Sequence, residues 1–335
     1  MRRPALLDLQ VNGYRGHDVN ADEVTVDEVI ALTRVLWSVG TARYLPTVIT
    51  GSEQRMIRSL RAIAQARRKD PRIAESIVGI HVEGPHLSNL QGARGAHEVR
   101  HILDPNPALF DRWMEAADGL VKIVTIAPEL PGSANYIRHV VDAGVTVSLG
   151  HSSAEPQHIM AAVEAGAQLS THLGNGIPAE IPRHPNQIWS QLAADELTAM
   201  FILDGHHLPS SAATAMLRAK GLERSLMVSD SATLAGSPPG EYVTPVGGHV
   251  EVSEDGALRL PGSTLLAGSG ACLLQCVKWA TESLPFTIDE LWPLASTGPG
   301  ELLGVDVTGD ALIIDDQWQV REVRLAGEPV YRAGT

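Results

Sequence analysis

Short runs of apolar residues recur along the chain, and segments with helical spacing separate them. The runs cover residues 6–11, 43–48, 76–84, 121–129, 146–151, 169–175, 199–204 and 226–231. Most are near-continuous in apolar residues rather than alternating, which is typical of parallel strands covered by helices. Several of the intervening segments end in Gly, the usual helix stop. Eight such units in succession predict an α/β fold, a (β/α)8 barrel of the TIM type.

The eighth unit is interrupted after its strand. A stretch rich in Gly and Pro follows, with a hairpin-like pair of apolar runs around residues 254–256, and residues 311–331 contain further short strand patterns. We therefore predict that residues 1–232 and 266–305 form the barrel. Residues 233–265 and 306–335 are expected to form a small, reduced β appendage.

A polar residue ends four of the apolar runs. These residues are Glu83, His151, His172 and Asp230. Because the carboxyl ends of barrel strands converge, the four side chains are expected to meet at one mouth of the barrel. Taken singly, each has an ordinary structural reading, as a hydrogen-bonded strand end or a cap. Taken together, one carboxylate and two imidazoles suit an open catalytic metal site, with Asp230 as the proton acceptor beside it.

Composition narrows the classes of partner. The formal net charge of −13 over 335 residues argues against a nucleic-acid partner, which would require clustered Lys and Arg. No apolar stretch approaches the roughly 20 residues needed to span a bilayer, and the N-terminus lacks a signal-peptide pattern, so we expect no membrane partner and a cytoplasmic location. Cys272 and Cys276 lie at helical spacing, and we interpret them as buried thiols because a structural zinc needs four ligands.

The order of short motifs is more specific than any one of them. HVEGPH at 81–86, GARGAH at 92–97, GHSSA at 150–154, THLGN at 171–175, DGHH at 204–207, VSD at 228–230 and LAGS at 266–269 follow one another along the barrel. This series resembles the motifs of the N-acetylglucosamine-6-phosphate deacetylases in the amidohydrolase superfamily. The resemblance implies metal-dependent hydrolysis on a (β/α)8 barrel, in agreement with the strand pattern.

The resemblance also implies roles for individual residues. Glu83, His151 and His172 match the metal ligands, and Asp230 matches the general base and acid. His97 matches a histidine that contacts the sugar, and we expect it to act in catalysis with Asp230. Asn175, Arg183 and His207 match positions that hold the phosphate, and Gly176 is also expected to bind the substrate. In the family the arginine reaches the active site of the neighbouring subunit. A homodimer with shared sites is therefore expected, with a small amino-sugar phosphate as the substrate.

The first strand departs from the pattern of many amidohydrolases. Gln10 and Asn12 stand where two histidines often help to bind a second metal. Neutral amides are weak ligands for transition metals. We therefore predict one divalent metal ion per chain, with Gln10 and Asn12 lining the substrate pocket. Zinc is the first expectation for this ion, and the ligand set also suits iron, manganese or cobalt.

Two further departures bear on the substrate. The segment Gly174–Ile177 replaces the usual Phe-Asn-Ala-Met, and His86 replaces the usual Phe; both are expected to border the pocket. The first expectation for the function is deacetylation of N-acetylglucosamine 6-phosphate to glucosamine 6-phosphate and acetate. An amidohydrolase for another N-acyl sugar or a cyclic amide is the alternative, and a non-catalytic barrel that binds a sugar phosphate is the third reading.

Overall fold

Eight parallel strands form the centre of the molecule in the computed structural model, which describes residues 1–244, 248–262 and 266–334. The strands are β2 (Leu6–Val11), β5 (Thr41–Ile49), β6 (Ile80–Glu83), β7 (Val121–Ile126), β8 (Thr146–Leu149), β9 (Leu169–Ser170), β10 (Thr198–Ile202) and β11 (Ser225–Val228). Each pairs in parallel with its neighbours in chain order. The predicted strands and the (β/α)8 fold are confirmed.

The first and last strands meet and close the barrel. Val11 and Ser231 form a parallel bridge, and the backbone N–H of Asn12 donates to the carbonyl of Ser231 at 2.9 Å. The Oδ1 atom of Asp8 on β2 accepts the N–H of Ser229 at 3.2 Å. This closure brings the end of β2 beside the residues that follow β11.

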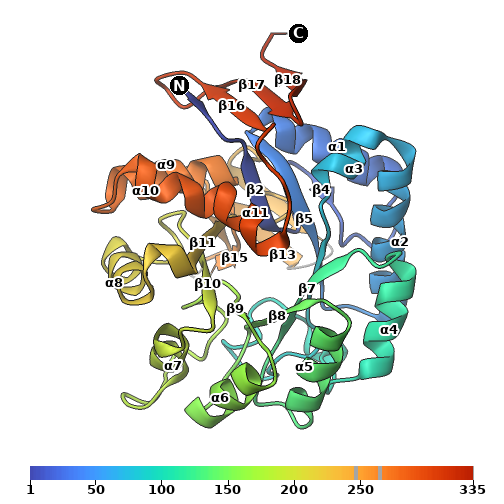
Figure 1. Ribbon diagram of the computed structural model, residues 1–335, viewed down its shortest axis with the longest axis vertical. Coiled ribbons are helices and arrows are strands. Elements are labelled where there is room, and N and C mark those ends of the chain that lie inside the picture. Colours follow the sequence, from blue (N-terminus) through green and yellow to red (C-terminus); the bar gives the residue numbers. More distant parts are fainter. Residues whose placement is uncertain (245–247, 263–265, 335) are drawn as a thin grey trace.

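Helices surround the barrel, as Figure 1 shows. They are α1 (Val26–Ser38), α2 (Glu53–Lys69), α3 (Pro71–Ser76), η1 (Val99–His101), α4 (Pro107–Ala116), α5 (Ser133–Asp142), α6 (Pro156–Glu164), α7 (Gln187–Ala193), α8 (Ser210–Lys220), η2 (Leu222–Arg224), α9 (Leu273–Ser283), α10 (Ile288–Leu291), η3 (Trp292–Ala295) and α11 (Thr297–Leu303). Helix α2 is typical: Ser52 caps its first turn, and Met56, Leu60 and Ile63 are buried at helical spacing. No helix among the described residues is long and apolar enough to cross a membrane.

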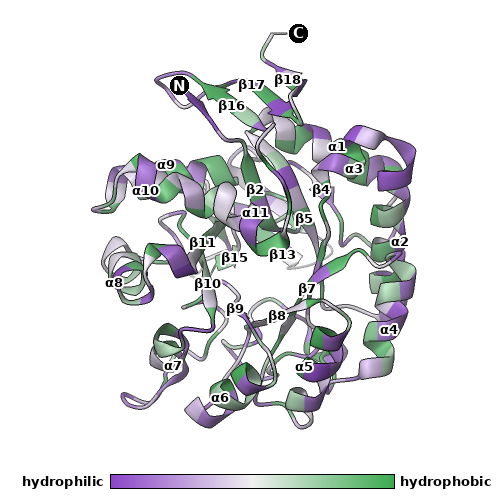
Figure 2. Cartoon of the chain, viewed as in Figure 1, coloured by the Kyte–Doolittle hydropathy of each residue, from purple (hydrophilic) through white to green (hydrophobic). Residues whose placement is uncertain are grey.

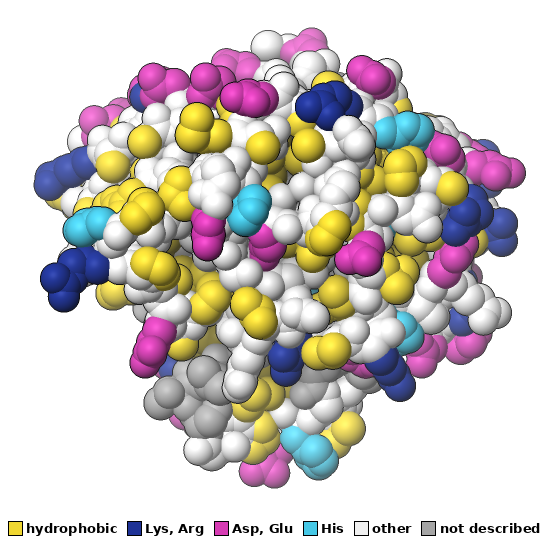
Figure 3. Space-filling model, turned by 90° about the horizontal axis from the view of Figure 1, so that it is seen from below, with side chains coloured by type: hydrophobic (Ala, Val, Ile, Leu, Met, Phe, Trp, Pro, Cys, Tyr) yellow, Lys and Arg dark blue, Asp and Glu magenta, His cyan; other side chains and the backbone are white. Residues whose placement is uncertain are grey.

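Apolar side chains fill two layers, inside the barrel and between its strands and helices, and Figure 2 shows the apolar residues along the strands. The inner cluster comprises Leu7, Leu9, Leu45, Ile123, Leu169, Met200, Ile202, Leu226 and Val228. Cys272 and Cys276 are free and buried, as predicted. Figure 3 shows one face of the molecule, over which Lys and Arg side chains are spread among acidic and apolar ones.

The strands outside the barrel form separate antiparallel sheets rather than one unit. One sheet joins β1 (Arg2–Arg3), β16 (Ala311–Ile314), β17 (Val320–Leu325) and β18 (Glu328–Arg332). The other joins β12 (Gly240–Thr244), β13 (Gly248–Val252), β14 (Leu258–Arg259) and β15 (Leu266–Gly268), and β3 (Gly13–Tyr14) pairs with β4 (His17–Asp18). The domain boundaries stay a prediction, and residues 245–247, 263–265 and 335 of the expected appendage lie outside the described residues.

Candidate metal centre and active site

Polar side chains leave four barrel strands at the same end. Glu83 is the last residue of β6, whereas His151, His172 and Asp230 each lie two residues beyond β8, β9 and β11. These three have left-handed backbone conformations, with φ of +49°, +29° and +49°. Such conformations cost about 1–3 kcal/mol in residues that carry a Cβ, and they concentrate at functional sites. The fold therefore stabilises a strained backbone at all three positions.

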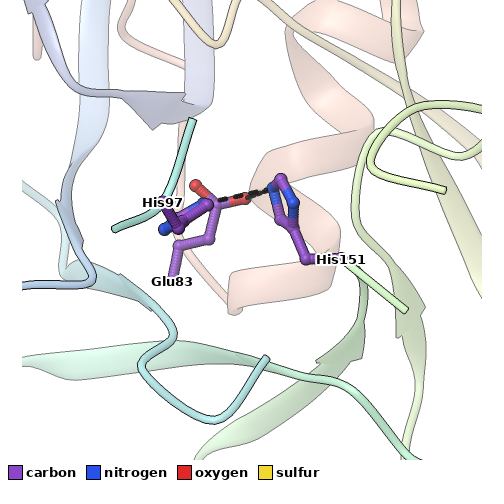
Figure 4. Close-up of side chains that lie close together, drawn as sticks. All are labelled: Glu83, His97 and His151. Carbon is purple, nitrogen blue, oxygen red and sulfur yellow. Dashed lines mark hydrogen bonds and ion pairs between the residues drawn. The ribbon is translucent and has the colours of Figure 1, made fainter. Parts of the chain in front are cut away.

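The side chains of the predicted ligands converge. Glu83 Oε1 lies 3.2 Å from Nε2 of His151 and 3.1 Å from Nε2 of His172, and these two nitrogens are 3.1 Å apart. His97 Nε2 lies 3.3 Å from Nε2 of His151. Figure 4 shows Glu83, His97 and His151 together, and one ligand atom from each of these three lies within 4.8 Å of the others. All four side chains are buried.

The donor set fits a cation. The Nδ1 atom of His151 lies 2.9 Å from the carbonyl oxygen of Ala93, which accepts its proton and leaves a lone pair on Nε2. That lone pair faces the Glu83 carboxylate and two further imidazole nitrogens. Such a convergence of acceptor atoms suits a metal ion of the transition series, and the buried group of Glu83, His97 and His151 could hold one. His172, the third predicted ligand, lies against Glu83 and His151 in the same cluster.

The pKa shifts of Glu83 and His172 also indicate that the cluster favours a positive charge. Burial acts to raise the pKa of Glu83, but its hydrogen bonds with His151 and His172 and the charges of both rings outweigh burial and hold the pKa well below its usual range. Burial acts to lower the pKa of His172, but the hydrogen bond and charge of Glu83 outweigh it and raise the pKa. The carboxylate therefore stays ionised, and its surroundings favour a cation beside it.

Asp230 lies next to the cluster in a different environment. Burial raises its pKa to about 6, and the negative charge of Glu83 adds to this effect. The Nδ2 of Asn12 donates to Asp230 Oδ1 at 2.8 Å and opposes the rise. A buried carboxyl with a pKa near neutrality can both take up and release a proton.

The amides of Gln10 on β2 and of Asn12, the residue after β2, both contact carboxylates. Gln10 Nε2 donates to Glu83 Oε1 at 3.1 Å, and Asn12 Nδ2 donates to Asp230. Each amide oxygen is buried and has no hydrogen-bond partner among the described residues. The two side chains therefore orient the carboxylates and leave their oxygens free for a ligand.

His97 lies in the buried cluster itself, with its Nε2 atom 3.3 Å from Nε2 of His151. Burial lowers its pKa to about 3, and the charge of His151 adds to this effect. The ring is therefore neutral. Its Nδ1 is buried without a partner among the described residues.

Of the residues expected to bind the substrate phosphate, Asn175 and Gly176 lie beside the cluster. Asn175 bonds locally to the carbonyl of His172, and the backbone of Gly176 packs on the His151 ring, where a Cβ would lie 2.8 Å from Nδ1. His207 lies beyond β10, whereas Arg183 lies on an exposed loop and its side chain makes no ion pair with any residue that the structure describes.

Asp204 is a site residue that the sequence reasoning missed. Its Oδ2 lies 2.8 Å from Nδ1 of His207, and its Oδ1 accepts the backbone N–H of His206 and of His207, both at 2.9 Å. Burial acts to raise the pKa of Asp204, but the hydrogen bonds and charge of His207 outweigh it and lower the pKa. The signal was present: Asp204 opens the DGHH motif at the end of a strand, like the other site residues.

One of the two expectations about the pocket border, that for His86, needs correction. The His86 ring is fully buried between Trp113 of α4 and Tyr136 of α5, with its hydrogen bonds to the chain at 103–106, and so it does not face the cluster. At Gly174 an added Cβ would lie 3.1 Å from Leu208 and 3.2 Å from Met216. An aromatic side chain there would meet these two residues. The rest of the segment does border the site, since residues 174–177 line a small cavity together with His151.

Known proteins resemble the chain over nearly all of its length. It is 31% identical to an N-acetylgalactosamine-6-phosphate deacetylase of Shewanella sp. (strain ANA-3), over 98% of this chain and 82% of that protein. It is also 31% identical to an N-acetylglucosamine-6-phosphate deacetylase of Danio rerio, over 98% and 84% of the two chains. No family model matches the chain.

Solved structures agree with the sequence relatives. An N-acetyl-D-glucosamine-6-phosphate deacetylase of Mycobacterium smegmatis superposes with a TM-score of 0.89 at 28% identity, covering 99% of this chain and 88% of that one. The enzyme of Thermotoga maritima superposes with a TM-score of 0.86 at 27% identity, covering 99% and 89%. The chain therefore belongs to the N-acetylglucosamine/N-acetylgalactosamine-6-phosphate deacetylase family of the amidohydrolase superfamily, whose members hydrolyse amide bonds.

Proposed function

We propose that the protein removes the acetyl group of N-acetylglucosamine 6-phosphate with one bound divalent metal ion, zinc being the first expectation. The observation that carries this proposal is the convergence of Glu83, His151 and His172 within 3.2 Å of one another, beside a buried Asp230. These three would hold the ion. When bound, it would act as a Lewis acid on the amide carbonyl and lower the pKa of water.

Asp230 is the proton carrier in this proposal. In its ionised form it takes the proton from the attacking water, and in its protonated form it gives a proton to the departing nitrogen. Asn12 holds the accepting oxygen in place by its 2.8 Å hydrogen bond. His97, neutral and buried beside the cluster, is placed to contact the amide or the sugar.

A single metal ion is supported by the contacts of the first strand. Gln10 and Asn12 use their N–H groups on Glu83 and Asp230, and their oxygens are weak ligands for a transition metal. Elemental analysis of purified protein is expected to give one equivalent of tightly bound metal per chain. Two equivalents would contradict the one-metal site.

The phosphate group is assigned to Asn175, Gly176, Arg183 and His207. The exposed position of Arg183 supports an interaction outside its own chain, and we propose that it binds the phosphate in the active site of a second subunit. Asp204 fixes the His207 ring through Nδ1, which leaves Nε2 for the ligand.

Acetate release from N-acetylglucosamine 6-phosphate, measured with a series of divalent metals, tests the proposed reaction. Asp230→Asn is the matched variant because it keeps the shape of the side chain. It is expected to retain its metal and lose at least a hundredfold in kcat, since general acid–base groups contribute about that much or more. Undiminished turnover by Asp230→Asn would remove Asp230 from the mechanism.

N-acetylgalactosamine 6-phosphate is a second candidate substrate, because relatives of equal identity carry either sugar in their names. The two sugars differ at one hydroxyl, so the comparison of kcat/KM for both phosphates decides between them. Loss of activity on the unphosphorylated sugars is expected in either case. A preference for an unphosphorylated N-acyl sugar would overturn the phosphate assignment.

A further inference from the structure

His97 is carried by a long loop, residues 84–106, that connects β6 to α4. In this loop the N–H of His97 donates to the carbonyl of Arg94 at 3.1 Å, and the carbonyl of Ala93 binds Nδ1 of His151 at 2.9 Å. The loop thus supplies one ring to the cluster and orients another. Its position decides where the Nε2 atom of His97 lies.

His86 binds the base of this loop through both ring nitrogens. Its Nδ1 lies 3.2 Å from the carbonyl oxygen of Leu103, and its Nε2 accepts the backbone N–H of Asn106 at 3.4 Å. The N–H of Leu103 donates in turn to the carbonyl of Pro85 at 3.0 Å. The pattern requires a neutral imidazole with its proton on Nδ1. Burial lowers the pKa of His86 to about 4, which keeps the ring in that form.

Helix packing fixes the ring in turn. Its centroid lies 4.8 Å from that of Tyr136, edge to face, and 5.8 Å from that of Trp113. The backbone carbonyl of His86 also accepts the N–H of Ala127, which follows β7, at 2.8 Å. The loop base is therefore attached to α4, α5 and the neighbouring strand through one residue.

We propose that His86 is a positioning residue, which holds the loop and with it His97 over the Glu83–His151–His172 cluster without contacting the substrate. An aromatic residue of the same size would fill the space but would leave the carbonyl of Leu103 and the N–H of Asn106 without these partners. The catalytic consequence rests on the proposed deacetylase function, whereas the effect on the loop does not.

Four variants separate the hydrogen bonds of His86 from its packing. His86→Phe keeps the packing and removes both bonds, His86→Asn places a donor near the position of Nδ1, and His86→Gln places an acceptor near that of Nε2. Tyr136→Phe is the control. The Tyr136 ring packs against His86, and its hydroxyl is buried and has no hydrogen-bond partner among the described residues.

Hydrogen exchange of residues 87–103 and acetate-release kinetics are measured on the metal-loaded proteins, well below their unfolding temperatures. In His86→Phe we expect faster exchange across the loop, including the amide of His97. We also expect a fall in kcat of roughly tenfold to a hundredfold, because small displacements of a reacting group have effects of that size. His86→Asn and His86→Gln are expected to fall between His86→Phe and wild type, and Tyr136→Phe to match wild type with unchanged metal content.

The two arms of the experiment distinguish the possible failures. A kcat in His86→Phe within twofold of wild type would overturn the positioning role, even if the variant melts at a lower temperature. Unchanged exchange across residues 87–103 would overturn it as well. If wild-type protein releases no acetate from any N-acetyl sugar phosphate, the proposed function fails, and the exchange arm still decides whether His86 holds the loop.

Discussion

Gly95 and Gly176 lie against the His151 ring and leave little room beside it. A Cβ at Gly95 would lie 3.0 Å from Cε1 of His151, and the backbone there is left-handed, with φ +56°. Gly95→Ala is therefore expected to displace the ring and to weaken metal binding by about tenfold, because orienting contacts around a ligand typically contribute tenfold to a hundredfold in affinity. Competition with a chromogenic chelator measures this change.

Gly304→Ala is the control for the glycine prediction. Gly304 has a similar φ of +64°, and a Cβ there would meet nothing within 4 Å. Both variants should lose about 1–2 kcal/mol of stability from the left-handed backbone, and only Gly95→Ala should lose metal affinity. Equal metal affinity in the two variants would contradict a steric role for Gly95.

The hydrogen bond from Asn12 to Asp230 predicts a pH effect with a definite sign. Asn12 donates to the ionised carboxylate and so lowers the pKa of Asp230. In Asn12→Ala the pKa of Asp230 should rise, so the base becomes protonated at a higher pH. The acid limb of kcat/KM should move up by about one pH unit, because a hydrogen bond to a charged group contributes about 1.5–3 kcal/mol. Asn135→Ala, at an exposed position of α5, should leave the profile unchanged.

At the scale of elements, Asp8 links the first and last strands of the barrel. Its buried Oδ1 accepts the N–H of Gln10 and of Ser229, both at 3.2 Å, and burial raises its pKa to about 7. Because this folded-state pKa lies above the ordinary aspartate value of 3.8, the folded protein binds more protons than the unfolded chain between these two values. Its stability therefore falls as the pH rises through them. Asp8→Asn keeps the acceptor oxygen and carries no charge.

The stability difference between Asp8→Asn and wild type should therefore grow from pH 5 to pH 8 in favour of the variant. The upper limit of this growth is about 3 kcal/mol, because about two pKa units of the shift lie between pH 5 and the folded-state pKa of about 7. Urea unfolding of the metal-free proteins at both pH values measures it, with Asp195→Asn as an exposed control. A difference that is the same at both pH values would show that Asp8 does not titrate in this window.

The strands were predictable from the sequence because nearly all residues of each strand are buried, with exceptions such as the exposed Lys122 of β7. Their ends were less so: the runs at 76–84 and 169–175 predict longer strands than β6 (Ile80–Glu83) and β9 (Leu169–Ser170). At His172 the backbone adopts a left-handed conformation, which is incompatible with strand pairing. The strand therefore ends before the ligand residue. Hydrophobic pattern alone carries no signal for that conformation.

At the scale of the whole molecule, the sequence predicted which strand-end residues lie together at the site. It did not predict the loop contacts that position the remaining site residues. Glu83, His151, His172 and Asp230 follow from strand ends that converge, since the barrel topology alone brings them together. The position of His97 could not be predicted in this way. His97 lies on a long loop, and the course of such a loop depends on tertiary contacts such as those of His86. A strand of two residues, β1, likewise forms only because β16 returns beside it.

A shared active site predicts that two inactive variants restore each other. If Arg183 serves the neighbouring subunit, a mixed dimer of Arg183→Ala and Asp230→Asn contains one site with both an intact Asp230 and an intact Arg183. Random exchange makes half of the dimers mixed, with one working site in two, so activity should recover to about a quarter of the wild-type value. The measurement is acetate release after co-refolding or co-expression of the two variants, with each homodimer as its own control. If Arg183 acted within its own chain, every mixed site would carry one defect, and the mixture would show no more than the average of the two variants.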